Sequence, residues 1–503
     1  METTQNNKTT SKGGEEINER TEEWTNFADA DALMDPSSLP EESFELDENG
    51  DGRDPPLSRD LIRDIEWKGN LLKVYPLDYQ RVPIVKYQVL ACFIMFAVFG
   101  FNDQSVGTLL PKLMEYYNTT KVQVSNIFLI QLSGYICASL LNERVHNSWG
   151  MRGGMLVAAT LCIVFFSILM SKPSKFSIFM FCCFPLGLGI GILDASCNVL
   201  VGNMIVHKNE LMGIMHAVYG CAAMLTPPLV AHFVKWGHWS MYFVIPFSMS
   251  VIGACVIIPS FRFETAAKYH YICEQDENAS TPEPTPEPTP SEQPLQKESF
   301  FALLSMPPIL LYALFLFAYL GAEITTGAWF YTYLLETKST DQIKMSYIAS
   351  TFWIGLTAGR LILGFFTKKA FSNEYRACRV YCALTLFFYT LYMVVGWINS
   401  ESLSYLISLS FVMFCCGFFI GPLFPSASIV AVQVLPKKLQ ISGVGIAVAL
   451  GGCGGAILPY SAGILTHLIG IKWMPTLCWF MVALFSFIWM LYPRYIKGHS
   501  DVL

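Results

Sequence analysis

The chain has 503 residues, of which 53% are hydrophobic and 14% are charged. An average soluble domain carries about 25% charged residues, so the composition excludes an ordinary soluble domain and indicates a protein that crosses a membrane several times. The formal net charge of −6 comes from an acidic N-terminal segment, so it carries no information about a ligand.

Residues 1–86 are predicted to form a disordered, acidic, cytoplasmic tail. In the first 66 residues, acidic side chains outnumber basic ones about three to one, and aromatic residues are few. Such a segment buries too little apolar surface to offset the entropy that it would lose on ordering. The tail is therefore expected to contribute nothing to the folded core.

Apolar runs predict twelve membrane-spanning helices in two sets of six. Each run is close to the roughly 20 residues that an α-helix needs to cross a bilayer. The runs lie at residues 87–110, 123–142, 153–171, 176–200, 211–235 and 239–260, and then at residues 307–334, 344–366, 377–397, 402–433, 440–466 and 473–493. The predicted fold is therefore an all-α membrane protein with six-helix halves at residues 87–261 and 307–493, an arrangement found in many transporters.

Residues 262–306 are predicted to form a cytoplasmic linker between the halves. They contain a Thr-Pro-Glu-Pro repeat from Thr281 to Pro290, which favours a solvated polyproline II conformation. Lysine and arginine are more frequent in the loops on the side of the N-terminus, so this side is predicted to be cytoplasmic. An even number of spans also places residues 494–503 there. The plasma membrane is the first expectation for the location, the vacuolar or another internal membrane is the alternative, and the oligomeric state stays open.

Four ionisable residues lie inside predicted spans, namely Asp103, Asp194, Glu323 and Arg360. A charged group near the bilayer centre costs several kcal/mol, so each is expected to face the bundle interior or a solvent pathway. Asp103 and Glu323 lie at corresponding positions, about sixteen residues into the first span of each half. The three carboxylates are predicted proton-coupling sites, and a purely structural role, held by neighbouring polar groups, is the alternative.

Arg360 has two predicted roles. It either gates the inner face of the bundle by pairing with a carboxylate or a helix C-terminus, or its long side chain simply extends to the cytoplasmic interface. Lys368 and Lys369 mark the edge of this span. Gating is the favoured role.

Polar residues near the acids are candidates for solute binding. Asn198 lies one helical turn after Asp194 and therefore shares its face, and His216 and Tyr219 share a face of the fifth span. For His216, a core histidine that is bonded to the backbone is an equally good explanation.

Signals for a metal, a cofactor or an enzyme are weak. Most of the 15 cysteines lie in predicted spans, and their spacing is not that of a zinc site. No nucleophile or phosphate-binding constellation stands out. We therefore expect no enzyme activity, no metal or cofactor, and no nucleic-acid partner; the expected partners are the bilayer, a small solute and a proton.

Several motifs resemble those of a known transporter family. They are Asp103 with Leu109-Leu110-Pro111, Gly134-Tyr135 with Asn142 and Arg144, Asp194 with Asn198 and Asn203, Glu210 to Gly213 with His216 and Tyr219-Gly220, Gly321-Ala322-Glu323, Gly359-Arg360, and Gly421 to Pro425. With these motifs, the membrane region resembles the major facilitator superfamily, specifically its fucose/proton symporter-like branch in fungi.

The resemblance implies uptake of a sugar or sugar-like solute with a co-transported proton, as the two halves rock around a central site. Asp194 matches the fourth-span acid that such symporters use for proton coupling, where bacterial members typically have Glu. In those members the first-span acid lies about one turn further on, where this chain has Gly107. Asp103 therefore either takes this role from another turn or does not contact the solute.

A sugar site needs converging hydrogen-bond donors and acceptors together with an aromatic platform. The predicted binding residues are Asn102, Gln131, Asn198, Asn203, His216, Tyr219, Trp329 and Tyr331. The aromatic residues near span ends also fit an interfacial belt.

The predicted cycle starts with protonation of Asp194 from outside, followed by solute binding, closure of the outer gate, inward opening and loss of the proton. A protonated acid costs less to bury, which permits the switch. Three alternatives stay open: a facilitator with purely structural carboxylates, a proton antiporter, and a nutrient-sensing receptor that binds solute without moving it.

Overall fold

The computed structural model describes residues 61–279, 306–398, 400–434 and 437–492. They belong to one compact unit, Leu57–Leu503. Most of the expected acidic tail, the Thr-Pro repeat and residues 494–503 lie outside the described residues.

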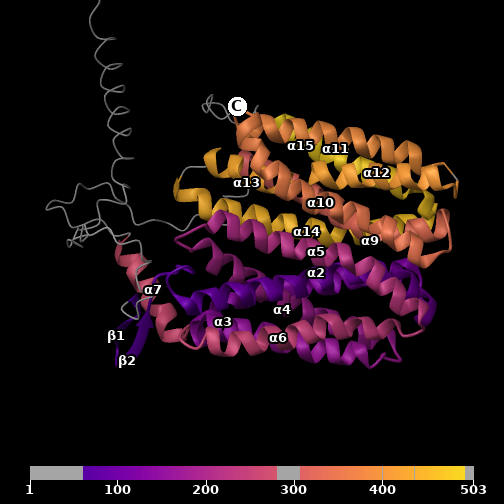
Figure 1. The fold of residues 1–503 in the computed structure, drawn as a ribbon. Helices are drawn as coiled ribbons and strands as arrows, with labels where there is room; N and C mark the ends of the chain where they lie inside the picture. Colours follow the sequence, from indigo (N-terminus) through magenta and orange to yellow (C-terminus); the bar gives the residue numbers. More distant parts are fainter. Residues whose placement is uncertain (1–60, 280–305, 399, 435–436, 493–503) are drawn as a thin grey trace, which may run out of the picture. The chain divides into compact units, whose positions relative to one another are not determined.

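The N-terminal half is a bundle of long helices (Figure 1). Its elements are α2 (Pro83–Tyr117), α3 (Lys121–Met170), α4 (Phe176–Gly202), α5 (Lys208–Lys235), and the 3₁₀ turn η4 (Trp239–Phe243) that continues into α6 (Val244–Ser260). α3 contains two spans, because Gly150 has a φ of 68° and reverses the chain in the middle of the element. α3 begins in a capping box, in which Thr120 and Gln123 each bond the other's backbone N–H.

The C-terminal half repeats this arrangement. Its elements are α9 (Pro307–Thr337), α10 (Gln342–Ala370), α11 (Glu374–Gly396), α12 (Leu403–Ile420), α13 (Leu423–Val434), α14 (Lys437–Ile469), the 3₁₀ turn η5 (Ile471–Trp473) and α15 (Met474–Leu491). α12 and α13 together correspond to the single predicted span at residues 402–433.

Ten of the described helical segments are long and apolar enough to cross a membrane. One of them is α3, which holds two spans. α10, which carries Arg360, is a further helix of 29 residues that packs beside α5, α9 and α12. The helices are therefore consistent with the twelve predicted crossings.

The structure differs from the prediction at residues 61–86. β1 (Arg63–Trp67) and β2 (Asn70–Val74) form an antiparallel hairpin in this part of the expected tail. Its two-residue turn has positive φ at Lys68 and Gly69, the backbone that tight hairpins prefer. α2 also starts earlier than expected, at Pro83.

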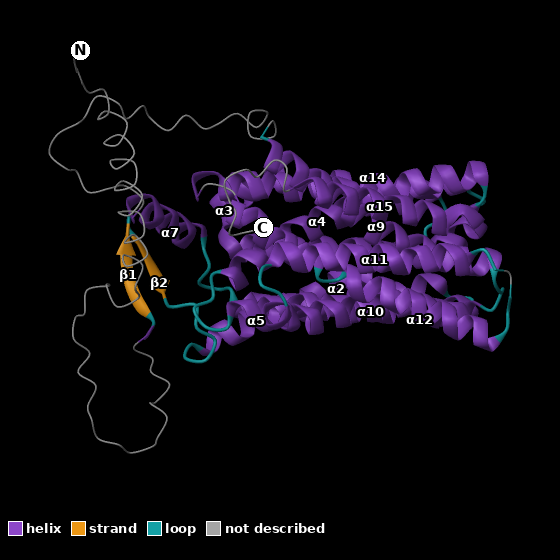
Figure 2. Cartoon of the chain, turned by 90° about the horizontal axis from the view of Figure 1, so that it is seen from above, coloured by secondary structure: helices purple, strands orange, loops and turns teal. Residues whose placement is uncertain are grey.

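The expected linker also begins with a helix, α7 (Ala266–Ala279). The Nζ atom of Lys68 lies 2.9 Å from an Oε atom of Glu274 in α7, and the rings of Trp67 and Tyr271 lie 6.2 Å apart. The hairpin and α7 therefore form one small unit. Figures 1 and 2 show this unit at one end of the helix bundle, which we call the hairpin end; the opposite end is the distal end.

The two halves meet along three pairs of helices. α2 packs against α9, α3 against α14, and α5 against α10. The first helices of the two halves, α2 and α9, face each other, whereas α3 and α10 each pack against the fifth span of the opposite half, so the interface follows the repeat. The ionisable residues predicted inside the spans lie on α2, α4, α9 and α10.

Candidate functional site

Asp194 lies on α4 and is held by two neutral side chains. The hydroxyl of Tyr135, on α3, donates to Oδ2 of Asp194 at 2.5 Å. The amide of Asn198 donates to Oδ1 at 2.8 Å and to the Asp194 carbonyl at 2.9 Å. All three residues are partly exposed, and both partners of the carboxylate are uncharged.

Asp103 lies on α2 in a second neutral cluster. The amide of Gln131, on α3, donates to Oδ1 of Asp103 at 3.0 Å, and the hydroxyl of Tyr219, on α5, donates to Oδ2 at 3.2 Å. α2 also packs against α4, the helix that carries Asp194. Three helices thus hold this acid near a second acid, and in the described part of the chain neither has a cationic partner within ion-pair distance.

Glu323 lies on α9 in an environment of the opposite kind. Nη2 of Arg360, on α10, lies 2.9 Å from one carboxylate oxygen of Glu323 and 3.2 Å from the other. The hydroxyl of Tyr319 donates to the same carboxylate at 2.5 Å. The Glu323 side chain is only 3% exposed. Arg360, whose side chain is 20% exposed, therefore forms an ion pair with a buried carboxylate.

Tyr135 and Tyr319 are site residues that the sequence analysis did not select. Each lies four residues from a selected residue on the same helix, since Tyr135 follows Gln131 and Tyr319 precedes Glu323. Residues at this spacing are neighbours on a helix surface. A search for hydroxyl groups one turn from each intramembrane polar residue would have found both.

The structure does not bring every predicted binding residue to the acids. Trp329 is fully buried and donates from its indole to the carbonyl of Pro459 at 2.9 Å. Tyr331 donates to the carbonyl of Gln342 at 3.3 Å. Asn203 is exposed at the hairpin end, at the C-cap of α4.

Asn102 and His216 lie near the Asp103 cluster along the chain. Asn102 is buried, and its Nδ2 has no hydrogen-bond partner among the described residues. His216 lies one turn before Tyr219 and packs edge-on against Phe96, with ring centroids 5.4 Å apart. Asn102 is thus the chain neighbour of Asp103, and His216 lies one turn from Tyr219, which bonds Asp103.

Contacts between the halves gather from the middle of the bundle to its distal end. Nζ of Lys121 lies 2.7 Å from an Oε atom of Glu336, and Gln104 donates to the carbonyl of Gly327 at 3.0 Å. Nearer the acids, the ring of Tyr219 lies 6.5 Å from that of Trp353. These contacts close the distal end of the interface between the halves.

Comparison with known proteins identifies the family. The sequence profile of the Major Facilitator Superfamily matches residues 92–437, more than half of the chain. The chain belongs to the Major Facilitator Superfamily. It is therefore an integral, multi-pass membrane protein and a transporter of small solutes, not an enzyme.

Two relatives in sequence are similar over most of their length. Bypass of stop codon protein 6 of Saccharomyces cerevisiae is 59% identical over 448 residues, which cover 89% of this chain and 90% of the relative. Glucose/mannose transporter GlcP of Bacillus subtilis is 23% identical over 372 residues, which cover 74% of this chain and 86% of the relative. The yeast name specifies no solute, whereas the bacterial name does.

Solved structures of transporters share the fold. A D-xylose-proton symporter superposes with a TM-score of 0.61 at 10% identity, covering 83% of this chain and 99% of that one. A POT family transporter in complex with 5-aminolevulinic acid gives 0.58 at 14% identity, covering 82% and 97%. At these identities the similarity shows the fold alone.

Gly107 occupies the position at which the symporters that this chain resembles have their first-span acid. A Cβ atom at Gly107 would collide with the backbone of Ala328 on α9, so α2 and α9 touch directly at this point. A carboxylate side chain does not fit there in this conformation. Asp103, one turn closer to the hairpin end, is free of this contact.

Proposed function

We propose that the protein is a proton-coupled symporter of a sugar or sugar-like solute, in the fucose/proton symporter-like branch of the superfamily. The observation that supports the proposal is that one intramembrane carboxylate has a cationic partner and the other two have neutral partners. Glu323 has a permanent cation, Arg360, whereas Asp194 and Asp103 are held by neutral amides and hydroxyls.

The neutral partners favour a proton as the coupling ion. A carboxylate at membrane depth is costly to bury unless it is paired or neutralised. Tyrosine and asparagine bonds keep Asp194 in place without cancelling its charge, so a proton is the simplest group that can cancel it when the halves close. Asp194 is our first choice for the coupling residue and Asp103 our second.

Glu323 and Arg360 are assigned a gating role in this proposal, as a fixed pair that holds α9 and α10 together while the N-terminal half opens and closes the pathway against them. Their ion pair joins α9 to α10 and is complete without a proton. If Glu323 binds no proton, the proton-coupling residues are Asp194 and Asp103, which both belong to the N-terminal half. The C-terminal half then supplies the rigid partner against which that half moves.

The solute proposal is supported by the groups around the acids and by one relative. The Asp103 and Asp194 clusters present amide and hydroxyl groups from Gln131, Asn198, Tyr135 and Tyr219, the kinds of group that bind sugar hydroxyls. The similarity to Glucose/mannose transporter GlcP points to the same class of solute.

We also propose an orientation with the hairpin end in the cytoplasm, which follows from the distribution of lysine and arginine. Both termini would then be cytoplasmic. The closed distal end would face outward, and the conformation described here would be the one shut to the exterior. The plasma membrane is our proposed location.

The test is uptake into vesicles that contain the purified protein. Labelled hexoses, pentoses and deoxysugars would be offered with and without a proton gradient, to the wild type and to Asp194→Asn and Asp103→Asn. The matched control is Asp341→Asn, because Asp341 only caps α10 at the distal end and asparagine caps equally well.

We expect gradient-driven accumulation that a protonophore abolishes, and its loss in Asp194→Asn with sugar exchange retained. The control should accumulate sugar like the wild type. Transport that ignores the gradient would support a facilitator, and proton-driven efflux an antiporter. Binding without movement would support a receptor, and no interaction with any sugar would reject the solute class.

A further inference from the structure

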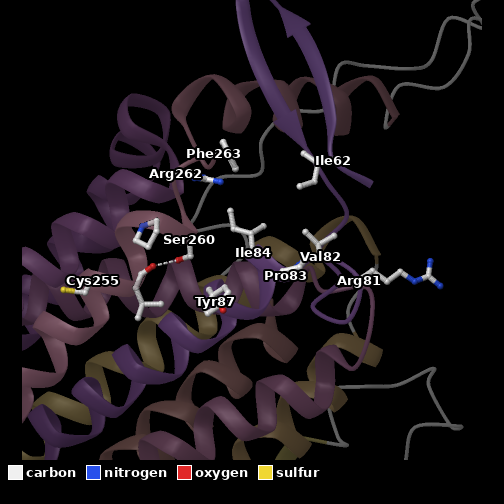
Figure 3. Close-up of a pocket in the computed structure, with 12 residues that line it drawn as sticks. Ile62, Arg81, Val82, Pro83, Ile84, Tyr87, Cys255, Ser260, Arg262 and Phe263 are labelled. Carbon is white, nitrogen blue, oxygen red and sulfur yellow. Dashed lines mark hydrogen bonds between the residues drawn. The ribbon is translucent and has the colours of Figure 1, made fainter. Parts of the chain in front are cut away.

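A cavity of about 760 Å³ lies away from the transport site, at the hairpin end of the N-terminal half (Figure 3). Its walls come from the start of α2, the end of α6 and the residues that flank the hairpin. Most of the lining is apolar, including Val82, Ile84 and Phe263. The volume lies within the range of about 300–1,000 Å³ that is typical of small-molecule sites.

Two arginines are the charged residues of the lining. Arg81 is 74% exposed, and its Nε lies 3.7 Å from a carboxylate oxygen of Asp78. Arg262 is exposed and stacks over the ring of Phe263 at 4.5 Å. Figure 3 shows Ile84 near Arg262, and the exposed Arg81 side chain extending outward beyond Val82 and Pro83 at the rim of the cavity. Guanidinium groups present paired donors that match phosphate oxygens, so this edge of the cavity suits a phosphate.

The start of α2 adds to the positive potential at the same place. Pro83 opens the helix, and the side chain of Val82 provides no cap. The N-terminus of a helix carries a partial positive charge that attracts anions. Here it lies beside the two arginines and reinforces them.

The remaining side of the cavity leads to the membrane-facing surface. Tyr87 is 57% exposed, and Cys255 and Pro259 are exposed as well. These residues lie in the first turns of α2 and the last turns of α6, two of the helices that are long and apolar enough to cross a membrane. The cavity is therefore amphipathic, with cations at its aqueous edge and an apolar surface toward the hydrocarbon.

We infer that this cavity binds an anionic glycerophospholipid, with its phosphate near Arg81 and Arg262 and an acyl chain along Ile84, Tyr87 and Cys255. The inference concerns a different site from the proposed solute and proton site, and it rests only on the orientation proposed above. Basic pockets beside membrane helices attract acidic headgroups on the cytoplasmic side. A zwitterionic lipid fills the apolar part equally well but brings no net negative charge to the two arginines.

The first test is lipid retention by the full-length protein, released from bilayers that contain equal amounts of phosphatidylserine and phosphatidylcholine and weighed by native mass spectrometry. The variants are Arg81→Gln and Arg262→Gln. The control is Arg379→Gln, which removes an exposed arginine at the hairpin end of α11. We expect preferential retention of phosphatidylserine, which falls about fivefold with each cavity arginine lost and is unchanged in the control.

The second test follows alkylation of Cys255 by a membrane-permeant maleimide. Phosphatidylserine should slow this reaction in the wild type but not in the arginine double variant. Cys221 is also exposed and lies outside the lining, so it reports general effects of the bilayer. Glycerophosphoserine, which lacks acyl chains, should give no protection.

Three results would overturn the inference. Equal retention of the two lipids would show a general lipid contact, and protection of Cys255 by glycerophosphoserine would show a site for a free phosphate ester. Protection of Cys255 in pure phosphatidylcholine, lost when the acidic residues 1–60 are neutralised, would show that this segment of the chain occupies the cavity.

Discussion

The first helix of each half carries a carboxylate at the same position, but the two carboxylates have different kinds of partner. Asp103 on α2 accepts hydrogen bonds from an amide and a hydroxyl, and a second acid, Asp194, lies on the adjacent helix α4. Glu323 on α9 is buried against the guanidinium of Arg360. Negative charge is therefore left uncompensated in the N-terminal half and is cancelled in the C-terminal half.

This difference indicates that the two halves of the repeated fold have different roles. A buried ion pair is costly to break, so the helices that it joins are expected to move together. A carboxylate among neutral partners can change its charge by exchanging a proton without losing its position. The comparison predicts that substitutions in the C-terminal half mainly change stability, whereas those in the N-terminal half mainly change coupling.

The largest effect is expected for Arg360→Met, which would leave Glu323 buried without its cation. Removing one partner of a buried pair typically costs about 3–5 kcal/mol. Unfolding of the detergent-solubilised protein would measure the loss. The double variant Arg360→Met/Glu323→Gln should recover much of it, because the uncompensated charge is gone.

Arg379→Met is the control for this experiment, since Arg379 is exposed and its loss should leave stability nearly unchanged. An additional loss in the double variant, in place of a recovery, would contradict the role given to the ion pair. The division between the halves would then have to be abandoned.

A smaller effect is expected for Gly107→Ala. The added Cβ would collide with the backbone of Ala328, and overpacking of this kind costs about 1–3 kcal/mol. Because the contact joins the two halves, the cost should fall on the distally closed state more than on the fold. Carbodiimide coupling of Lys121 to Glu336, whose charged atoms lie 2.7 Å apart, would measure closure.

Gly213→Ala is the matched control, because a Cβ at Gly213 on α5 meets no atom within 4 Å. The coupling yield should fall in Gly107→Ala and stay constant in the control. An unchanged yield in both variants would show that α2 and α9 need not touch at Gly107 for the distal end to close.

The sequence was sufficient to predict the bundle, because a helix in lipid must be apolar over its whole length. The spans and the two halves follow from that pattern, whereas the superfamily was expected from motifs that resemble those of its members. The hairpin and α7 were missed for the opposite reason. Their residues are polar and lie next to an acidic segment. A prediction from the average composition of the segment therefore overlooks the local turn at Lys68-Gly69.

The candidate site was only partly predictable, since periodicity gives a residue's face but not its partner on another helix. Asn198 was found because its partner Asp194 lies one turn away. Tyr135 was missed as a partner of Asp194 because the two residues lie on different helices. Trp329 was selected as an aromatic platform, but its indole bonds the backbone of α14, a contact that no spacing rule reveals.

The ends of the first helices sharpen the comparison of the two halves. α2 ends on Asn118, a neutral residue with a φ of 52°. α9 ends on Lys338, whose Nζ donates to the carbonyls of Gly396 and Ile398 at 2.7 and 2.6 Å. Burial, with a contribution from the charge of Lys472, lowers the pKa of Lys338 to about 8 from an ordinary value of 10.5.

The lowered pKa predicts a stability that rises with pH. Between about pH 8 and pH 10.5, the folded protein binds fewer protons at Lys338 than the unfolded chain does, so the free energy of unfolding increases. Below about pH 8 both states are protonated and this contribution is constant. For one proton the slope is at most about 1.4 kcal/mol per pH unit, and solvent near the group reduces it.

Unfolding midpoints of the wild type and Lys338→Met, compared from about pH 7 to about pH 10, would measure this effect. The wild type should gain stability relative to the variant over the upper part of this range. Lys344→Met, which removes an exposed lysine at the same end, should show a constant difference. A constant difference for Lys338→Met as well would mean that the amine keeps its charge when buried.

The smallest effect is expected for the ion pair between Lys121 and Glu336, which joins the halves at the distal end. The Glu336 side chain is 39% exposed and that of Lys121 is 17% exposed, and exposed pairs contribute about 0.2–1 kcal/mol. A double-mutant cycle with Lys121→Met and Glu336→Gln would measure the coupling free energy, which should shrink as salt is added because screening weakens exposed charges. In contrast to the Arg360–Glu323 pair, this ion pair can break and reform in each transport cycle at little cost.

A coupling free energy as large and as independent of salt as that of the buried pair would contradict this prediction. It would mean that the ion pair holds the distal end closed. The buried and the exposed ion pairs would then no longer distinguish the fixed from the moving parts of the protein.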